Sequence, residues 1–131
     1  MSGEKNLEKL VKEMKPELNA GTYVFVSVAT TVGIERKYIL CQFNEKEGIT
    51  LVLEQKHADT YKLSYDYVAS WIRLNVHSSL DAVGLTALFS SELAKHEISC
   101  NVISGYYHDH IFVNNKDGQK AINVLLELTK K

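Results

Sequence analysis

The segment HSSLDAVG, residues 77–84, combines a histidine, two serines, an aspartate and a glycine directly after an apolar, strand-like run. Ser79 is a residue type that caps helices, and Asp81 in a first turn favours the positive end of the helix dipole. The unpaired backbone amides of such a turn attract anions. The sequence therefore predicts either a small-anion site at this helix start or an ordinary capped helix in which Gly84 packs against a strand.

A second cluster of side chains that could do chemistry is His108-Asp109-His110. Side chains two residues apart on a strand face the same way, so the two imidazoles could bind a divalent metal together. A zinc site would need a third ligand, such as His77. The alternative is the solvated end of a hairpin beside Gly105. Two ligands fall short of the usual coordination, so we expect no metal or cofactor. A metal-dependent enzyme that uses His108 and His110 stays an alternative.

Other catalytic patterns are scarce. Serine, histidine and aspartate occur together within residues 77–81, but catalytic triads are defined by their spatial roles and not by adjacency in sequence. The chain has no G-x-S-x-G elbow, phosphate loop or H-E-x-x-H motif. Cys41 and Cys100 form no C-x-x-C pair, and Cys100 lies in an apolar pattern that indicates burial. We therefore expect no catalytic activity.

Hydrophobic periodicity predicts the elements that must position these residues. Helices are expected at residues 7–14, 55–63, 79–98 and 121–128, and strands at residues 22–28, 34–43, 49–53, 71–76, 99–103 and 110–113. The second half thus has the order β-α-β-β-α, which is the ferredoxin-like arrangement without its last strand. A strand from the first half could complete that sheet.

Composition and charge exclude several classes of protein. The chain has 131 residues, of which 45% are hydrophobic and 24% charged, as in a soluble folded domain. The formal net charge of -1 gives no basic surface of the kind that binds nucleic acid. No run approaches the roughly 18 apolar residues of a membrane span, and the N-terminal residues do not resemble a signal peptide. We expect no nucleic-acid partner, no membrane association and a cytoplasmic location.

Residues 76–89, VHSSLDAVGLTALF, followed by ISCNVI at residues 98–103, resemble the ACT domain. The shared features are a strand, a D-x-x-G segment at the first helix, and a later strand that contains N-V-I. The whole chain, including residues 104–113, is similar to small stand-alone bacterial proteins with two ACT-like units. The resemblance implies an ACT-like half at residues 1–66 and an ACT domain at residues 67–131. It also implies an α+β, ferredoxin-like (βαββαβ) sandwich whose two joined halves share an antiparallel sheet.

The same resemblance implies a regulatory module that binds a free amino acid or a related small metabolite between paired units. The ligand carboxylate would bind the amides of residues 80–82, and Asp81 would pair with the ligand ammonium. The resemblance also implies a partner enzyme. A homo-oligomer is expected for a separate reason, because a sheet with helices on one face only leaves its other face and its edges to be covered. The predicted ligand-binding residues are His77, Ser78, Ser79, Asp81, Gly84, Asn101 and Ile103, with Ala29, Thr30, Thr31 and Gly33 in the corresponding turn of the first half. The alternative is a protein–protein interaction module that regulates a metabolic enzyme and binds no small ligand.

Overall fold

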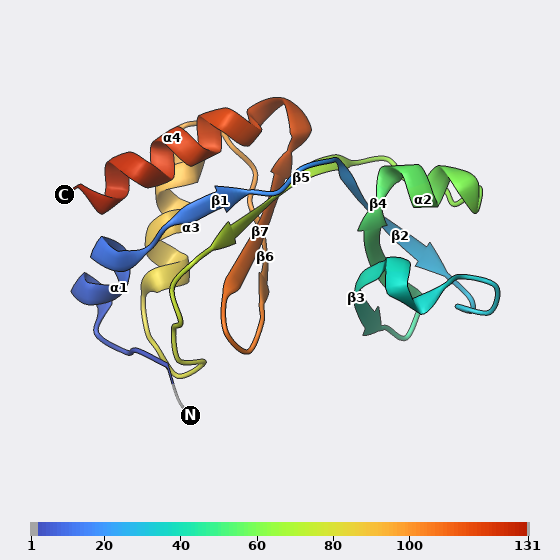
Figure 1. Ribbon diagram of the computed structural model, residues 1–131, viewed down its shortest axis with the longest axis horizontal. Coiled ribbons are helices and arrows are strands. Elements are labelled where there is room, and N and C mark those ends of the chain that lie inside the picture. Colours follow the sequence, from blue (N-terminus) through green and yellow to red (C-terminus); the bar gives the residue numbers. More distant parts are fainter. Residues whose placement is uncertain (1–2, 131) are drawn as a thin grey trace. The chain divides into compact units, whose positions relative to one another are not determined.

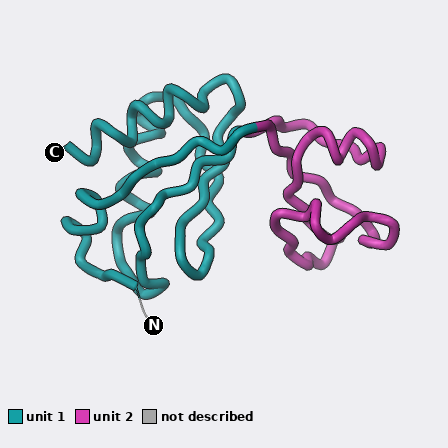
Figure 2. The backbone as a smooth tube through the Cα atoms, viewed as in Figure 1, with its two compact units in different colours: residues 1–20, 70–131 teal, residues 21–69 magenta. Residues whose placement is uncertain are grey.

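The computed structural model describes residues 3–130, and the chain divides into two compact units (Figure 2). Unit 1 consists of residues 1–20 and 70–131, and unit 2 consists of residues 21–69. The units therefore interleave along the chain, whereas the halves predicted from the sequence, residues 1–66 and 67–131, are continuous. The difference arises because the N-terminal helix and strand pack with the second half of the chain.

Unit 1 has the ferredoxin-like βαββαβ arrangement (Figure 1). Its elements are α1 (Leu7–Glu13), β1 (Pro16–Leu18), most of β5 (Val68–Leu74), α3 (Leu85–Lys95), β6 (Asn101–Ser104), β7 (Asp109–Asn114), the 3-10 helix η2 (Asn115–Asp117) and α4 (Gly118–Thr129). The strand order is β1-β5-β7-β6, and β1 pairs antiparallel with β5 from Pro16↔Leu74 to Leu18↔Ile72. The strand β1 thus supplies the last strand that the β-α-β-β-α order lacked. The prediction that a first-half strand completes the sheet is confirmed.

One face of the unit 1 sheet is covered by α1, α3 and α4 (Figure 1). Because side chains alternate along a strand, Ile72 and Leu74 of β5 and Ile111 and Val113 of β7 point to this face and are buried. They pack with helical residues of the same core, including Phe89. The residues between them on each strand point to the opposite face of the sheet.

Unit 2 repeats the strand order of unit 1 in a smaller form. Its elements are β2 (Tyr23–Val28), the 3-10 helix η1 (Arg36–Tyr38), β3 (Ile39–Asn44), β4 (Ile49–Glu54) and α2 (Gln55–Thr60). Strand β4 lies between β3 and β2, and the first residues of β5 continue the sheet through Tyr23↔Ala69 and Val24↔Val68. The strand β5 therefore contributes to both units. The predicted α+β, ferredoxin-like fold is confirmed.

Two predicted elements begin five or more residues later in the structure than predicted. The extended run predicted at residues 34–43 is wrong over its first part, because η1 precedes β3, which begins only at Ile39. The helix predicted to begin after Ser79 begins at Leu85 instead. The reason is local: the Ser79 hydroxyl accepts a hydrogen bond from the Asp81 amide at 3.1 Å, which closes a turn that competes with a helix. Gly84 then turns the chain into α3 with a φ of 99°.

Within the described residues, no helix has the length and apolar character that crossing a membrane requires.

Candidate functional site

Two adjoining surface pockets lie where the chain passes from β5 to α3 in unit 1. The outer pocket, about 180 Å³, is lined by Gly3, His77, Ser78, Ser79, Leu80, Asp81 and Tyr106. The inner pocket, about 100 Å³, is lined by Ser78, Ser79, Leu80, Ala82, Gly84, Leu85, Thr86, Ser104 and Asp109. The segment Ser78–Leu80 belongs to both pockets and so forms the wall between them.

The N-terminal segment holds this wall in place. The Glu4 amide donates to the His77 carbonyl and the Ser79 amide donates to the Glu4 carbonyl, both at 2.9 Å, so Glu4 and Ser78 form an isolated parallel bridge. A Cβ on Gly3 would lie only 2.6 Å from the Ser78 carbonyl carbon. Glycine at this position therefore permits the close backbone approach that fixes residues 77–79.

The inner pocket reaches the N-terminus of α3. Gly84 is the N-cap residue and offers no side chain, so no side-chain hydrogen bond caps this helix of 11 residues. The first residues of the helix, Leu85 and Thr86, line the pocket. First-turn amides lack partners within a helix and carry the positive end of its dipole. The walls of the inner pocket thus combine a positive helix end with serine and threonine hydroxyls.

The amides that the sequence suggested for anion binding lie in a different environment. The Asp81 amide donates to the Ser79 hydroxyl, and the Ala82 amide donates to the Ser79 carbonyl at 2.9 Å. Both groups are therefore satisfied within the turn. The Asp81 side chain is 83% exposed and pairs with Lys5 at 3.7 Å. The expectation that residues 80–82 open the helix is wrong, because α3 begins later.

The predicted site residues divide among three places. The structure brings His77, Ser78, Ser79 and Asp81 together around the outer pocket, and Ser78, Ser79 and Gly84 around the inner one. Asn101 and Ile103 lie on β6 and line neither pocket; Asn101 donates to the Phe112 carbonyl at 3.3 Å. Ala29, Thr30, Thr31 and Gly33 lie between β2 and η1 in unit 2, and they also line neither pocket.

Among the pocket-lining residues with polar side chains, sequence reasoning missed four, namely Thr86, Ser104, Tyr106 and Asp109. Asp109 is the most notable, because it is only 8% exposed although it is charged. The sequence contained a signal for it: Asp109 alternates with Ile111 and Val113, and a carboxylate in the core-facing register of an apolar strand is unusual.

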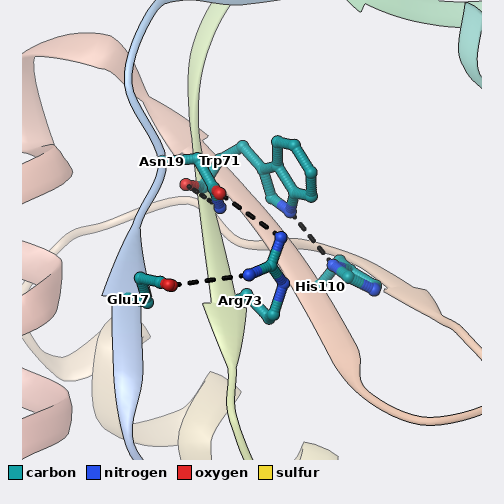
Figure 3. A network of polar contacts seen from close by, with 5 residues as sticks. All are labelled: Glu17, Asn19, Trp71, Arg73 and His110. Carbon is teal, nitrogen blue, oxygen red and sulfur yellow. Dashed lines mark hydrogen bonds and ion pairs between the residues drawn. The ribbon is translucent and has the colours of Figure 1, made fainter.

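The histidine cluster lies at the start of β7, and part of it belongs to a polar network on the sheet face opposite the helices (Figure 3). The Trp71 indole N–H donates to Nδ1 of His110 at 3.0 Å. Burial lowers the pKa of His110, and the charges of Arg73 and His108 lower it further. The rings of His108 and His110 are 6.4 Å apart, and among residues 3–130 no group of three or more His, Cys, Asp or Glu side chains could hold a metal.

Both cysteines are free thiols. Burial raises the pKa of Cys100 to about 11, which suppresses the thiolate at neutral pH. Since the thiolate is the nucleophilic form, Cys100 is a poor candidate for covalent catalysis. Cys100 is only partly buried and packs against the unit 1 core, so the buried thiol expected from the apolar strand pattern is confirmed only in part.

Comparison with known proteins identifies the family. Models described as ACT domain match residues 2–70 and residues 67–127. No curated protein matches the chain. Among solved structures, a protein of unknown function from Vibrio cholerae, described as a possible transport protein, is 47% identical. That match covers 95% of this chain and 97% of the other, with a TM-score of 0.84.

Two more distant structures share the fold. The ligand-free regulatory subunit of aspartate kinase from Thermus thermophilus is 6% identical, with a TM-score of 0.59, over 89% of this chain and 99% of that one. Escherichia coli aspartokinase III, solved in complex with aspartate and ADP, is 9% identical, with a TM-score of 0.64, over 88% of this chain and 33% of that one. Together with the fold, the family matches support a regulatory module that binds a small ligand. The chain belongs to the ACT domain family.

Proposed function

We propose that this protein is a regulatory module without catalytic activity of its own, and that it binds a free amino acid in the inner pocket of unit 1. The observation that carries the proposal is the uncapped N-terminus of α3, which opens onto a pocket lined by hydroxyl groups. An amino-acid carboxylate is the small anion that such a helix end stabilises. The two ACT domain matches support a small-molecule ligand.

The proposed binding mode assigns a task to each group around the pocket. The backbone amides of Leu85 and Thr86 donate to the ligand carboxylate, with the hydroxyls of Ser78 and Ser79 beside them. Gly84 allows the backbone to turn at a positive φ just before these amides. This helix start takes the place of the amides at residues 80–82.

The remaining predicted residues have looser roles in the proposal. His77 and Asp81 line the outer pocket, which adjoins the inner one, and would contact the part of the ligand that extends beyond the inner pocket. Asn101 and Ile103, and the turn at residues 29–33, line neither pocket and stay predictions.

The test combines a ligand screen with a variant that places a negative charge at the positive N-terminus of α3. Wild-type protein is screened against the common amino acids by thermal shift, and hits are measured by calorimetry. A ligand at 100 times its dissociation constant adds about 2.7 kcal/mol to the free energy of unfolding. Thr86→Glu then places a competing carboxylate in the first turn, where it stabilises the helix by about 0.3–1 kcal/mol and repels the ligand. Loss of binding in this variant therefore cannot be attributed to unfolding.

Thr86→Gln is the matched variant, with the same side-chain length and no charge. We expect the glutamate variant to bind the amino acid on the order of tenfold or more weakly than the glutamine variant, because the added carboxylate repels that of the ligand. Equal affinities of the two variants, or no thermal shift with any amino acid, would contradict the proposal.

We also propose that the protein self-associates in the cytoplasm and acts on a partner enzyme. The support for self-association is the edge strand β3 of unit 2, which is free of charged residues and leaves Leu40 and Phe43 exposed. Exposed apolar edge strands are prone to pair with another chain. Sedimentation analysis of the wild type and of Phe43→Lys checks this: a dimer or larger assembly is expected for the wild type, and a purely monomeric wild type contradicts it.

A further inference from the structure

Asp109, the first residue of β7, lies in an unusual position for a charged side chain. Ile111 and Val113 of the same strand are core residues beneath the helices, so alternation places Asp109 on that same face. Its partner across the hairpin is Ser104, and both residues line the inner pocket. Asp109 therefore lies on the sheet beneath the start of α3, and only 8% of its surface is exposed.

The Asp109 carboxylate has no hydrogen bond or ion pair with any other residue that the structure describes. Yet within residues 3–130 no fully buried polar side-chain atom lacks a partner. The two findings are compatible only if the carboxylate oxygens reach open space. The inner pocket, which Asp109 lines, is that space.

The Asp109 carboxylate therefore keeps only the hydration that the pocket allows, and no charge within residues 3–130 pairs with it, so a cation in the pocket would be stabilised beside it. The other buried polar side chain in unit 1 shows the usual solution: the Ser70 hydroxyl donates to the Asn115 side chain at 3.1 Å. Asp109 has no such arrangement, and its charge acts on the neighbouring His110, whose side chain points to the other face of the sheet. A cation that enters the pocket would therefore meet a negative charge that no side chain of the described residues neutralises.

The inner pocket thus has two walls of opposite character. The start of α3 offers amide donors at the positive end of the helix dipole, and Asp109 offers a negative charge. A ligand that carries a carboxylate and an ammonium on one carbon matches both walls. We propose that Asp109 binds the α-ammonium of the ligand, so that the inner pocket selects zwitterionic amino acids against acids that lack the amine. This inference rests on the proposed function and adds the group that decides ligand specificity.

The experiment uses ligand pairs that differ only in the amine, L-alanine with propionate and L-aspartate with succinate. Each is titrated by calorimetry into the wild type, Asp109→Asn, Asp81→Asn and Asp66→Asn. Asp66 is exposed in unit 2 and serves as the matched control for removal of one carboxylate charge. Removing one partner of a buried charge pair weakens binding by about 30-fold or more. We expect that loss for the amino acid in Asp109→Asn and unchanged binding in Asp66→Asn.

A purely structural role of Asp109 would leave the selectivity between an amino acid and its deaminated partner unchanged, so this selectivity is the decisive measurement. In the wild type, the amino acid is expected to bind at least about 30-fold more tightly than its deaminated partner, and Asp109→Asn should shrink this ratio toward one. If Asp109→Asn fails to fold, as judged by circular dichroism, the ratio in the wild type decides.

The outcomes separate the two proposals. Equal binding of the amino acid and its deaminated partner overturns the role of Asp109 while the anion site at α3 stands. Loss of amino-acid binding in Asp81→Asn but not in Asp109→Asn also overturns the role of Asp109. It would show that the ligand ammonium binds Asp81 in the outer pocket. Absence of binding by all four ligands, and by the wider amino-acid screen, overturns the proposed function and this inference together.

Discussion

Units 1 and 2 share one strand order, but they differ in the element that comes after the first central strand. In unit 1, β5 leads into the 11-residue helix α3, whereas in unit 2, β2 leads into the three-residue η1. The amides of the unit 2 turn are engaged locally: Val32 donates to the Thr30 hydroxyl at 3.2 Å, and Ile34 donates to the Thr31 carbonyl at 3.0 Å. The same sheet can therefore support either an open helix end or a closed turn, and the ligand site is expected at the former.

The hydrophobic cores of the two units also differ in how many helices they contain. The unit 1 core is built from three helices and the helix-facing sides of β5 and β7, whereas the unit 2 core joins β2 and β4 to the short helix α2. Unit 2 has no long helix in the place of α3, so it has neither the helix dipole nor the helix packing that α3 gives to unit 1. We expect the ligand site in unit 1, because the packing of α3 in the core holds the N-terminus of this helix in place.

The largest effect should come from the anchor of that helix. Phe89 of α3 is fully buried, and Phe89→Ala should lower the free energy of unfolding by about 3–5 kcal/mol, because it leaves a cavity. The comparison substitution in unit 2 is Val32→Ala, at a side chain that is 87% exposed, and it should change stability by less than about 0.5 kcal/mol. Urea unfolding followed by circular dichroism measures both. Similar losses for the two variants would contradict the assigned core.

A smaller difference is expected between the glycines of the two corresponding turns. Gly84 and Gly33 have φ values of 99° and 89°, a region that costs other residues about 1–2 kcal/mol. A Cβ on Gly84 would also meet the Leu7 side chain at 3.1 Å, whereas nothing lies within 4 Å of a Cβ on Gly33. Gly84→Ala should therefore destabilise the protein more than Gly33→Ala in the same unfolding assay. The reverse order would show that the turn before α3 is more tolerant than its contacts indicate.

The smallest effect concerns the polar network on the open face of unit 1. His110 accepts from Trp71 through Nδ1, so protonation of that nitrogen breaks the bond, and burial lowers the pKa of His110. The unfolded chain then binds this proton more readily than the folded one. The resulting stabilisation is complete above about pH 6.5 and is lost as the pH falls through the lower folded value.

Trp71 is the single tryptophan of the chain, so its fluorescence reports on this bond directly. A pH titration of the wild type should show an emission change below about pH 6.5. In His110→Gln, which keeps an acceptor but cannot titrate in this range, that change should disappear. Its persistence in the variant would assign the transition to another group.

The sequence was most informative where local pattern and tertiary packing agree. The alternation of Ile72, Leu74 and Val76 indicated β5, although the strand extends from Val68 to Leu74, and the need for a further strand anticipated β1. The start of α3 could not be found in this way, because Ser79 is as suited to closing a turn as to capping a helix. Only the positive φ of Gly84 decides between them.

Two features of the site depend on contacts that are distant in sequence. The bridge between Glu4 and Ser78 fixes the wall of both pockets, and no pattern in either segment indicates it. The meeting of Asp109 with the start of α3 likewise requires the three-dimensional arrangement of β7 and the helix. For Asp109 alone, however, the alternation with Ile111 and Val113 was visible in the sequence and would have justified including it among the candidates.

The most direct test of the proposed site is an NMR titration of ¹⁵N-labelled protein with the amino acid that gives the largest thermal shift. We expect the backbone amides of Leu85 and Thr86 to shift most, because they donate to the ligand carboxylate. Val32 and Ile34, in the corresponding turn of unit 2, should move little, since their amides are already engaged. Largest shifts at Val32 and Ile34, or saturation without any change at Leu85 and Thr86, would contradict a ligand site at the start of α3.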